Sequence, residues 1–188
     1  MGTLAVDNIQ HTDGSSAVTL NNANINITTG TFPAGHVLQV LSTSKVDVFT
    51  TQEQSYTDIT GFSVDITPSS TSSKILILAS CQFGSSSGGG YPSFRMVRDS
   101  TVINAGTAEG NRHPGVVTMN IYNADSGSGA MMNTHFLDSP ASTSSLTYKM
   151  QGQHSGAAIL IVGGGGNNPN STWATRSAST ITVMEIVG

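Results

Sequence analysis

Charge is scarce in this sequence. Only 10 % of its 188 residues are charged, and the 7 Lys and Arg form no cluster, whereas an average soluble protein has roughly 25 % charged residues. Binding to a nucleic-acid backbone requires several cations on one face of a protein. The dispersed cations and the net charge of -4 therefore argue against a nucleic-acid partner.

Cysteine and long apolar runs are scarce too. The single cysteine, Cys81, excludes an intrachain disulfide and a multi-cysteine zinc site, and its apolar neighbours predict a buried, inert thiol. No stretch approaches about 18 consecutive apolar residues, and residues 1–7 lack the basic region and apolar core of a secretory signal. We expect a soluble protein without membrane insertion.

Small polar residues are abundant in the sequence. Ser and Thr number 49, Gly 21 and Asn 13, and these residue types have poor helix propensity. From a junction near residues 32–35 onward, short apolar or alternating runs are separated by Gly, Pro, Asn and Ser clusters, which is the rhythm of antiparallel strands. The runs are 37–41, 46–50, 59–66, 74–83, 94–97, 102–105, 116–122, 131–137, 146–151, 157–162 and 180–187.

This pattern predicts an all-β fold, an antiparallel β-sandwich or jelly roll. We assign it to a knob domain at residues 37–188, preceded by an extended attachment and trimerisation segment at residues 1–36. Two runs, 75–79 and 158–162, are apolar on both faces. In an antiparallel sheet this indicates that the outer face is covered as well, and a subunit interface is the simplest cover.

Residues 1–36 contain short alternating apolar pairs, each too short to bury itself. Such a segment is either a disordered tail or a set of strands that pair with neighbouring chains, and the regular spacing of β-branched residues favours strands. The residues that we expect to attach the segment are Leu4, Val6, Ile9, Val18 and Leu20.

The sequence offers little for catalysis. Its eleven carboxylates are scattered beside turns, and its five histidines have no metal-ligand spacing. A histidine on a three-fold axis, His135 or His154, could bind an ion in a trimer, although an interface histidine is the simpler interpretation. The glycine runs 88–90 and 163–166 lack the features of a phosphate loop and are expected to be flexible. We expect no enzyme activity, no cofactor and no metal.

Three loops, 84–92, 106–115 and 163–173, carry the side chains most suited to recognition. The candidates are Tyr91, Arg112, His113, Asn167, Asn168 and Trp173. Aromatic faces beside amide and guanidinium donors are typical of carbohydrate binding, and such residues concentrate on loops that a rigid sandwich holds. The alternative is that Tyr91 and Trp173 close the ends of the core. Arg95 and Arg98 are expected to form ion pairs at a sheet edge or a subunit contact.

Several runs resemble the carboxy-terminal domains of bacteriophage fibre proteins, especially those of marine phages. They are residues 59–76 (ITGFSVDITPSSTSSKIL), 94–100 (FRMVRDS), 136–140, 147–149 and 178–186 (ASTITVMEI). Together they extend over residues 37–188, and residues 4–10 (LAVDNIQ) are similar to the segments with which such fibres begin.

The resemblance implies a homotrimer with a β-sandwich knob, an amino-terminal attachment segment and no enzyme activity. We therefore expect a structural protein of the virion, assembled in the host cytoplasm and bound to tail or capsid proteins through residues 1–36. The knob loops would then contact the host surface, with a surface glycan as a candidate receptor, and a tail fibre is favoured. The alternative is a head fibre or capsid decoration protein with a purely structural role.

Overall fold

The computed structural model describes residues 32–86, 91–120, 128–172 and 174–188, and in these residues it contains eleven strands and no helix. The strands are β1 (Val37–Lys45), β2 (Phe49–Thr51), β3 (Thr57–Ile66), β4 (Lys74–Ser85), β5 (Tyr91–Arg98), β6 (Thr101–Ile103), β7 (Val117–Thr118), β8 (Ala130–Asp138), β9 (Leu146–Ser155), β10 (Leu160–Val162) and β11 (Ser179–Ile186).

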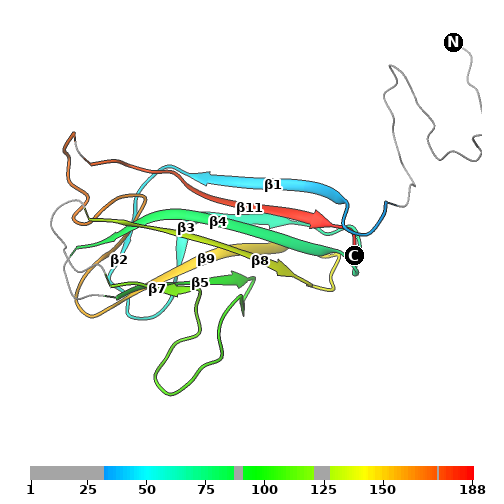
Figure 1. Ribbon diagram of the computed structural model, residues 1–188, viewed down its shortest axis with the longest axis horizontal. Helices are drawn as coiled ribbons and strands as arrows, with labels where there is room; N and C mark the ends of the chain where they lie inside the picture. The colour runs from blue at the N-terminus through cyan, green and yellow to red at the C-terminus, as the bar shows by residue number, and fades with distance from the viewer. Residues whose placement is uncertain (1–31, 87–90, 121–127, 173) are drawn as a thin grey trace, which may run out of the picture. The chain divides into compact units, whose positions relative to one another are not determined.

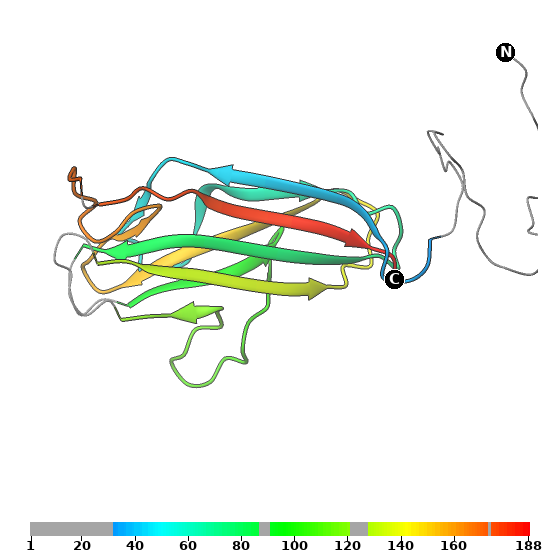
Figure 2. The same cartoon turned by 45° about the horizontal axis from the view of Figure 1, so that its top comes forward.

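The strands form two antiparallel sheets that lie over one another as two layers (Figures 1 and 2). Sheet A has the order β1-β11-β4-β10-β2, with β8 along the other edge of β4, and sheet B has the order β3-β9-β5-β6, with β7 beside β5. Early strands thus pair with late ones, β1 with β11 and β3 with β9, as in the nested pairing of a jelly roll. The predicted all-β sandwich is confirmed.

The core lies between the sheets and follows the alternation of the sequence. Phe62, Val64 and Ile66 on β3 point inward and are buried, as their spacing predicts. Across the sandwich, Phe83 of β4 meets Phe94 of β5 edge to face, with ring centroids 4.9 Å apart. Cys81 is buried as well, and burial raises the pKa of its thiol to about 12, so the predicted inert cysteine is confirmed.

The glycine run 163–166 is not a flexible loop, and that prediction is wrong. All four glycines are buried, and the amide of Gly166 donates to the Ser128 carbonyl over 2.7 Å. A Cβ on Gly84 would lie 2.5 Å from the carbonyl carbon of Gly165. The glycines are therefore required because two backbones pack against each other at this point.

The same run explains the apolar stretch 158–162. Ile161 is only 3 % exposed, and Gly164 lies so close that a Cβ there would be 3.7 Å from the Ile161 side chain. The chain therefore covers this strand itself, without a subunit interface. The outer face of β4, by contrast, is not fully covered by the described chain, because Leu78 remains 40 % exposed.

Two buried carboxylates connect distant parts of the sandwich. Glu185 of β11, 1 % exposed, accepts hydrogen bonds from the amide and hydroxyl of Ser69, the hydroxyl of Ser73 and the amide nitrogen of Gln39. Burial opposes ionisation of Glu185, but these hydrogen bonds outweigh it and lower the pKa of the carboxyl group. They tie β1, β11 and the turn before β4 together.

Asp138 at the end of β8 provides the second connection. It accepts hydrogen bonds from Arg98 of β5 and, over 2.7 Å, from the hydroxyl of Tyr148 of β9. Arg98 therefore forms its ion pair within the chain, across the two sheets, so an interface with another subunit is not needed for it.

Candidate recognition surface

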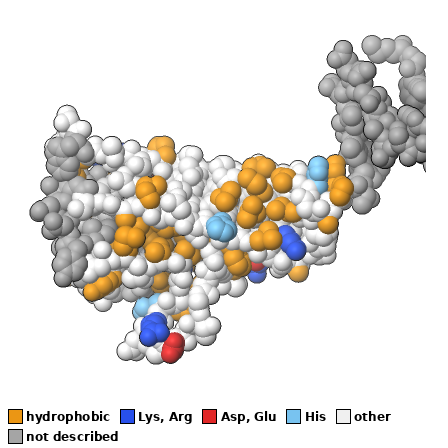
Figure 3. Space-filling model, in the orientation of Figure 1, with side chains coloured by type: hydrophobic (Ala, Val, Ile, Leu, Met, Phe, Trp, Pro, Cys, Tyr) orange, Lys and Arg blue, Asp and Glu red, His pale blue; other side chains and the backbone are white. Residues whose placement is uncertain are grey.

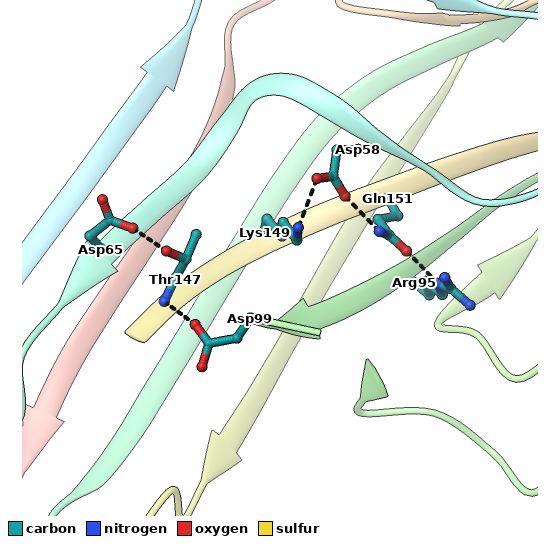
Figure 4. A network of polar contacts seen from close by, with 7 residues as sticks. All are labelled: Asp58, Asp65, Arg95, Asp99, Thr147, Lys149 and Gln151. Atoms are coloured by element: carbon teal, nitrogen blue, oxygen red, sulfur yellow. Dashed lines mark hydrogen bonds and ion pairs between the residues drawn. The ribbon is translucent and has the colours of Figure 1, made fainter. Parts of the chain in front are cut away.

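The outward face of sheet B carries a ladder of polar side chains across three strands (Figure 4). The register places Asp58 of β3 opposite Gln151 of β9, and Gln151 opposite Arg95 of β5. The amide nitrogen of Gln151 donates to the Asp58 carboxylate over 2.5 Å, and the amide oxygen of Gln151 accepts from Nε of Arg95 over 2.6 Å. The three side chains therefore form one connected row.

Lys149 reinforces this row from the neighbouring outward position of β9. Its ammonium group lies 2.7 Å from the Asp58 carboxylate, and the two side chains are 22 % and 53 % exposed. Burial raises the pKa of Asp58, but hydrogen bonds from Lys149 and Gln151 and the charges of Lys149 and Arg95 lower it further, so the net shift is downward. Asp58 is therefore a fixed negative charge beside two cations.

A second polar group lies at the other end of β9. The hydroxyl of Thr147 donates to Asp65 over 2.6 Å, and the amide of Thr147 donates to the carboxylate of Asp99 over 2.8 Å (Figure 4). Asp99 has a φ of 53° in the two-residue turn between β5 and β6, a conformation that Asp tolerates better than most residues. Its role is to hold this turn.

An aromatic ring lies over the cationic end of the row. The guanidinium carbon of Arg95 is 4.4 Å from the ring centroid of Tyr56, within the range of a cation–π contact. His113 meets the same ring edge-on at 6.3 Å. Burial raises the pKa of Tyr56 although the Arg95 charge and a hydrogen bond with Ser93 oppose the shift. We call Tyr56, Arg95 and His113 the aromatic cluster.

Of the predicted receptor residues that the structure describes, His113 alone lies in this cluster. Arg112, its neighbour, forms an exposed ion pair with Glu109 over 3.0 Å. Tyr91 begins β5 and is 47 % exposed. Trp173 and the predicted attachment residues lie outside the described residues.

Asn167 and Asn168 are in a different place, the loop that follows the buried glycine run. Both have left-handed backbone conformations, with φ values of 54° and 43°. Asn168 lines a hollow of about 220 Å³ together with Gly165, residues 169–171 and residues 174–176, and Arg176 is among them. Asn168 and His113 therefore belong to two different surface features.

The aromatic cluster and the row beside it have the chemistry of a recognition surface for hydroxyl-rich ligands. They combine an aromatic ring, a guanidinium group, an amide, a carboxylate and an ammonium group on a rigid sheet. In the described part of the chain, no three His, Cys, Asp or Glu side chains are grouped so that they could hold a metal ion. The same residues contain no helix long and apolar enough to cross a membrane.

Comparison with known proteins yields structural similarity only. No family model matches the chain, and no curated protein matches it. Among solved structures, the chain is similar to the infectious bursal disease virus VP2 subviral particle, with 16 % identity over 79 % of this chain and 41 % of that chain, at a TM-score of 0.39. The structure of the Gx strain of the same virus has 17 % identity over 87 % of this chain and 46 % of that chain, at a TM-score of 0.37.

This chain spans less than half the length of those viral chains. At TM-scores below 0.5 the similarity carries no argument about what this chain does.

Four residues of this surface were not predicted from the sequence: Tyr56, Asp58, Lys149 and Gln151. The alternation of β9 shows that Lys149 and Gln151 point outward, but the sequence does not give the register that places them beside Asp58 and Arg95. Tyr56 lies in the loop before β3, and no local pattern connects it with Arg95. A pair of outward polar positions on a predicted strand is the one signal that was available.

Proposed function

We propose that this chain is a structural protein of a virion, a homotrimeric fibre of the tail-fibre type that attaches through residues 1–36 and contacts the host surface with its knob. The resemblance of residues 37–188 to phage fibre domains supports the proposal, and the all-β sandwich fits it. The protein acts by binding, without catalysis.

The aromatic cluster carries the host-contact part of the proposal. The Arg95 guanidinium lies over the half-buried Tyr56 ring and His113 meets its edge, so the cluster presents stacked planar groups with polar edges, and the row from Asp58 to Gln151 supplies acceptors and donors next to it. This combination suits a sugar ring, which has apolar C–H faces and hydroxyl edges. Three copies in a trimer raise a weak sugar affinity by roughly 10² to 10⁴.

A glycan array with the full chain tests host contact. We expect binding to a surface polysaccharide or oligosaccharide, and at least about a tenfold loss for Arg95→Ala, because the variant loses the cation–π contact and the hydrogen bond to Gln151. The matched control is Arg176→Ala, which removes an exposed arginine from the hollow of the 163–176 loop. Loss of binding in the control alone would assign the ligand to that hollow and contradict the aromatic cluster.

The alternative function is a capsid head fibre or decoration protein without a ligand. One observation favours it: the polar groups of the ladder already bond to one another, as a purely structural surface requires. A folded, assembled chain that binds no glycan and no host cell would support this alternative.

The attachment segment is tested in the full chain. Leu4→Asp combined with Val6→Asp should leave the melting temperature of the knob unchanged and abolish co-purification with virus particles. Retention on the particle would contradict attachment through residues 1–36. Sedimentation of the wild-type chain tests the trimer, and a stable monomer at micromolar concentration would contradict it.

A further inference from the structure

Sheet A has an outward face that no other part of the described chain covers. We call the outward side chains of β1, β11, β4 and β8 the sheet A face. The register aligns them in rows: Val40, Met184, Leu76 and Leu137 in the first, Ser42, Thr182, Leu78 and His135 in the second, and Ser44, Thr180, Ser80 and Asn133 in the third. The first row is apolar on all four strands.

Several large apolar side chains of this face are well exposed to solvent. Val40 is 52 % exposed, Leu78 40 %, Leu137 47 % and Met131, at the far end of β8, 53 %. Figure 3 looks onto this face, and its hydrophobic side chains gather over the four strands. Apolar patches of several hundred Å² on a protein surface mark interaction sites.

The face is also nearly free of charge. Of its described residues only Lys74, at one end, is charged, and no carboxylate lies on it. The outward face of sheet B differs, since it carries Asp58, Asp65, Arg95 and Lys149. Copies of a chain with a net charge of -4 repel one another, and contact through the sheet A face brings no acidic groups together.

The polar side chains of the face are prepared for burial. The Ser80 hydroxyl donates to Asn133 over 2.7 Å, and the hydroxyls of Ser42 and Thr182 are 2.8 Å apart. Groups that already have partners lose less on leaving water than unpaired groups do. Ser80, Asn133 and Thr182 line a hollow of about 260 Å³ beside Leu78, which could receive a protruding side chain.

The size of the face suits an interface. Four strands at about 4.8 Å spacing are about 19 Å wide, and the length from Lys74 to Gln82 is about 30 Å, which gives roughly 570 Å² in projection. Each partner of a standard interface contributes about 800 Å² of accessible surface, and a corrugated sheet has a larger accessible area than its projection. The sheet A face alone therefore nearly suffices for a stable contact.

We propose that the sheet A face is the surface through which copies of this chain pack against one another. The inference deepens the proposed function, because it names the contact surface of the homotrimer, and it depends on that assembly existing. The occupant is a second copy of the chain, since the described part of the face has no acidic group whereas the chain as a whole is acidic.

The test compares Leu78→Arg with Val46→Arg in the full chain by light scattering after gel filtration. Leu78 lies in the centre of the face, whereas Val46, 74 % exposed, lies in the turn after β1. We expect the wild type and Val46→Arg to assemble and Leu78→Arg to be monomeric at the same concentration, with near-UV circular dichroism unchanged. A folded Leu78→Arg that still assembles would overturn the proposal.

Carbene footprinting of the wild type supplies a readout without any substitution. Assembly should protect Leu137 and Met131 from labelling at high concentration and leave Val46 labelled. Equal labelling of all three at every concentration would overturn the proposal. Protection that occurs only inside the particle, with a monomeric free chain, would assign the face to another virion protein and also overturn it, while leaving a virion role intact.

Discussion

The carboxylate of Glu185 gives the sharpest prediction about stability. Two oxygens, 1 % exposed, accept four hydrogen bonds, three at Oε1 from Ser69 and Ser73 and one at Oε2 from Gln39. In Glu185→Gln the amide oxygen can replace Oε1, but it is neutral, and the new amide nitrogen faces the Gln39 donor. Hydrogen bonds to charged groups contribute about 1.5–3 kcal/mol each and neutral ones about 0.5–1.5.

We therefore expect Glu185→Gln to lower the free energy of unfolding by about 2–3 kcal/mol at pH 7. For a unit of this size that corresponds to a melting temperature lower by about 4–12 °C. Urea unfolding followed by fluorescence or circular dichroism measures the difference. The exposed Glu53, substituted in the same way, is the matched control and should leave stability unchanged.

The loss should depend on pH in a defined direction. The folded pKa of Glu185 is below its ordinary value of 4.5, so its stabilisation is complete above pH 4.5 and disappears as the pH falls through the folded pKa. The wild type and Glu185→Gln should therefore converge in acid, because protonated Glu resembles Gln. A difference of the same size at pH 7 and pH 3, or no difference at pH 7, would refute this reasoning.

Two further predictions concern buried positions. His154 is fully buried with Nε2 2.8 Å from the Ser85 hydroxyl, and burial lowers its pKa below 6.5 although the Ser155 backbone opposes the shift. Wild-type stability should thus fall as the pH drops from about 6.5 toward the folded pKa. In urea titrations His154→Gln should lack this pH dependence. A variant with the same pH profile as the wild type would contradict the prediction. Gly84→Ala should cost about 1–3 kcal/mol through overpacking against Gly165. Gly106→Ala, with no atom within 4 Å of the new Cβ, should leave the free energy of unfolding unchanged in thermal melts of both variants. Equal losses in the two variants would show that the contact between Gly84 and Gly165 is not rigid.

The strands could be predicted from the sequence because each one carries its own alternating or apolar pattern. The predicted run 74–83 became β4 (Lys74–Ser85) and 131–137 became β8 (Ala130–Asp138). The bounds of short strands were predicted less accurately from the sequence. The run 46–50 became β2 (Phe49–Thr51), because the residues after β1 form the turn that carries the chain to the next strand of sheet A.

The candidate recognition surface could not be predicted, because it depends on which strands become neighbours. Arg95 and Tyr56 are separated by more than thirty residues, and only the β3-β9-β5 order brings them together. What covers β10 could not be predicted for the same reason. An apolar strand requires burial, but the sequence does not say whether another subunit or the chain's own glycine run provides it.

The pairing of β1 with β11 also determines how the sandwich responds to a pulling force. Gly35 and His36 bond to Val187, so the first described residues and the carboxyl end meet at the same end of the sandwich, opposite the end that carries the 163–176 loop (Figure 1). Tension between these ends acts parallel to β1 and shears its ladder with β11, loading many hydrogen bonds together, whereas a perpendicular pull would unzip them singly. The first described strand, β1, is thus loaded in shear along its whole ladder with β11.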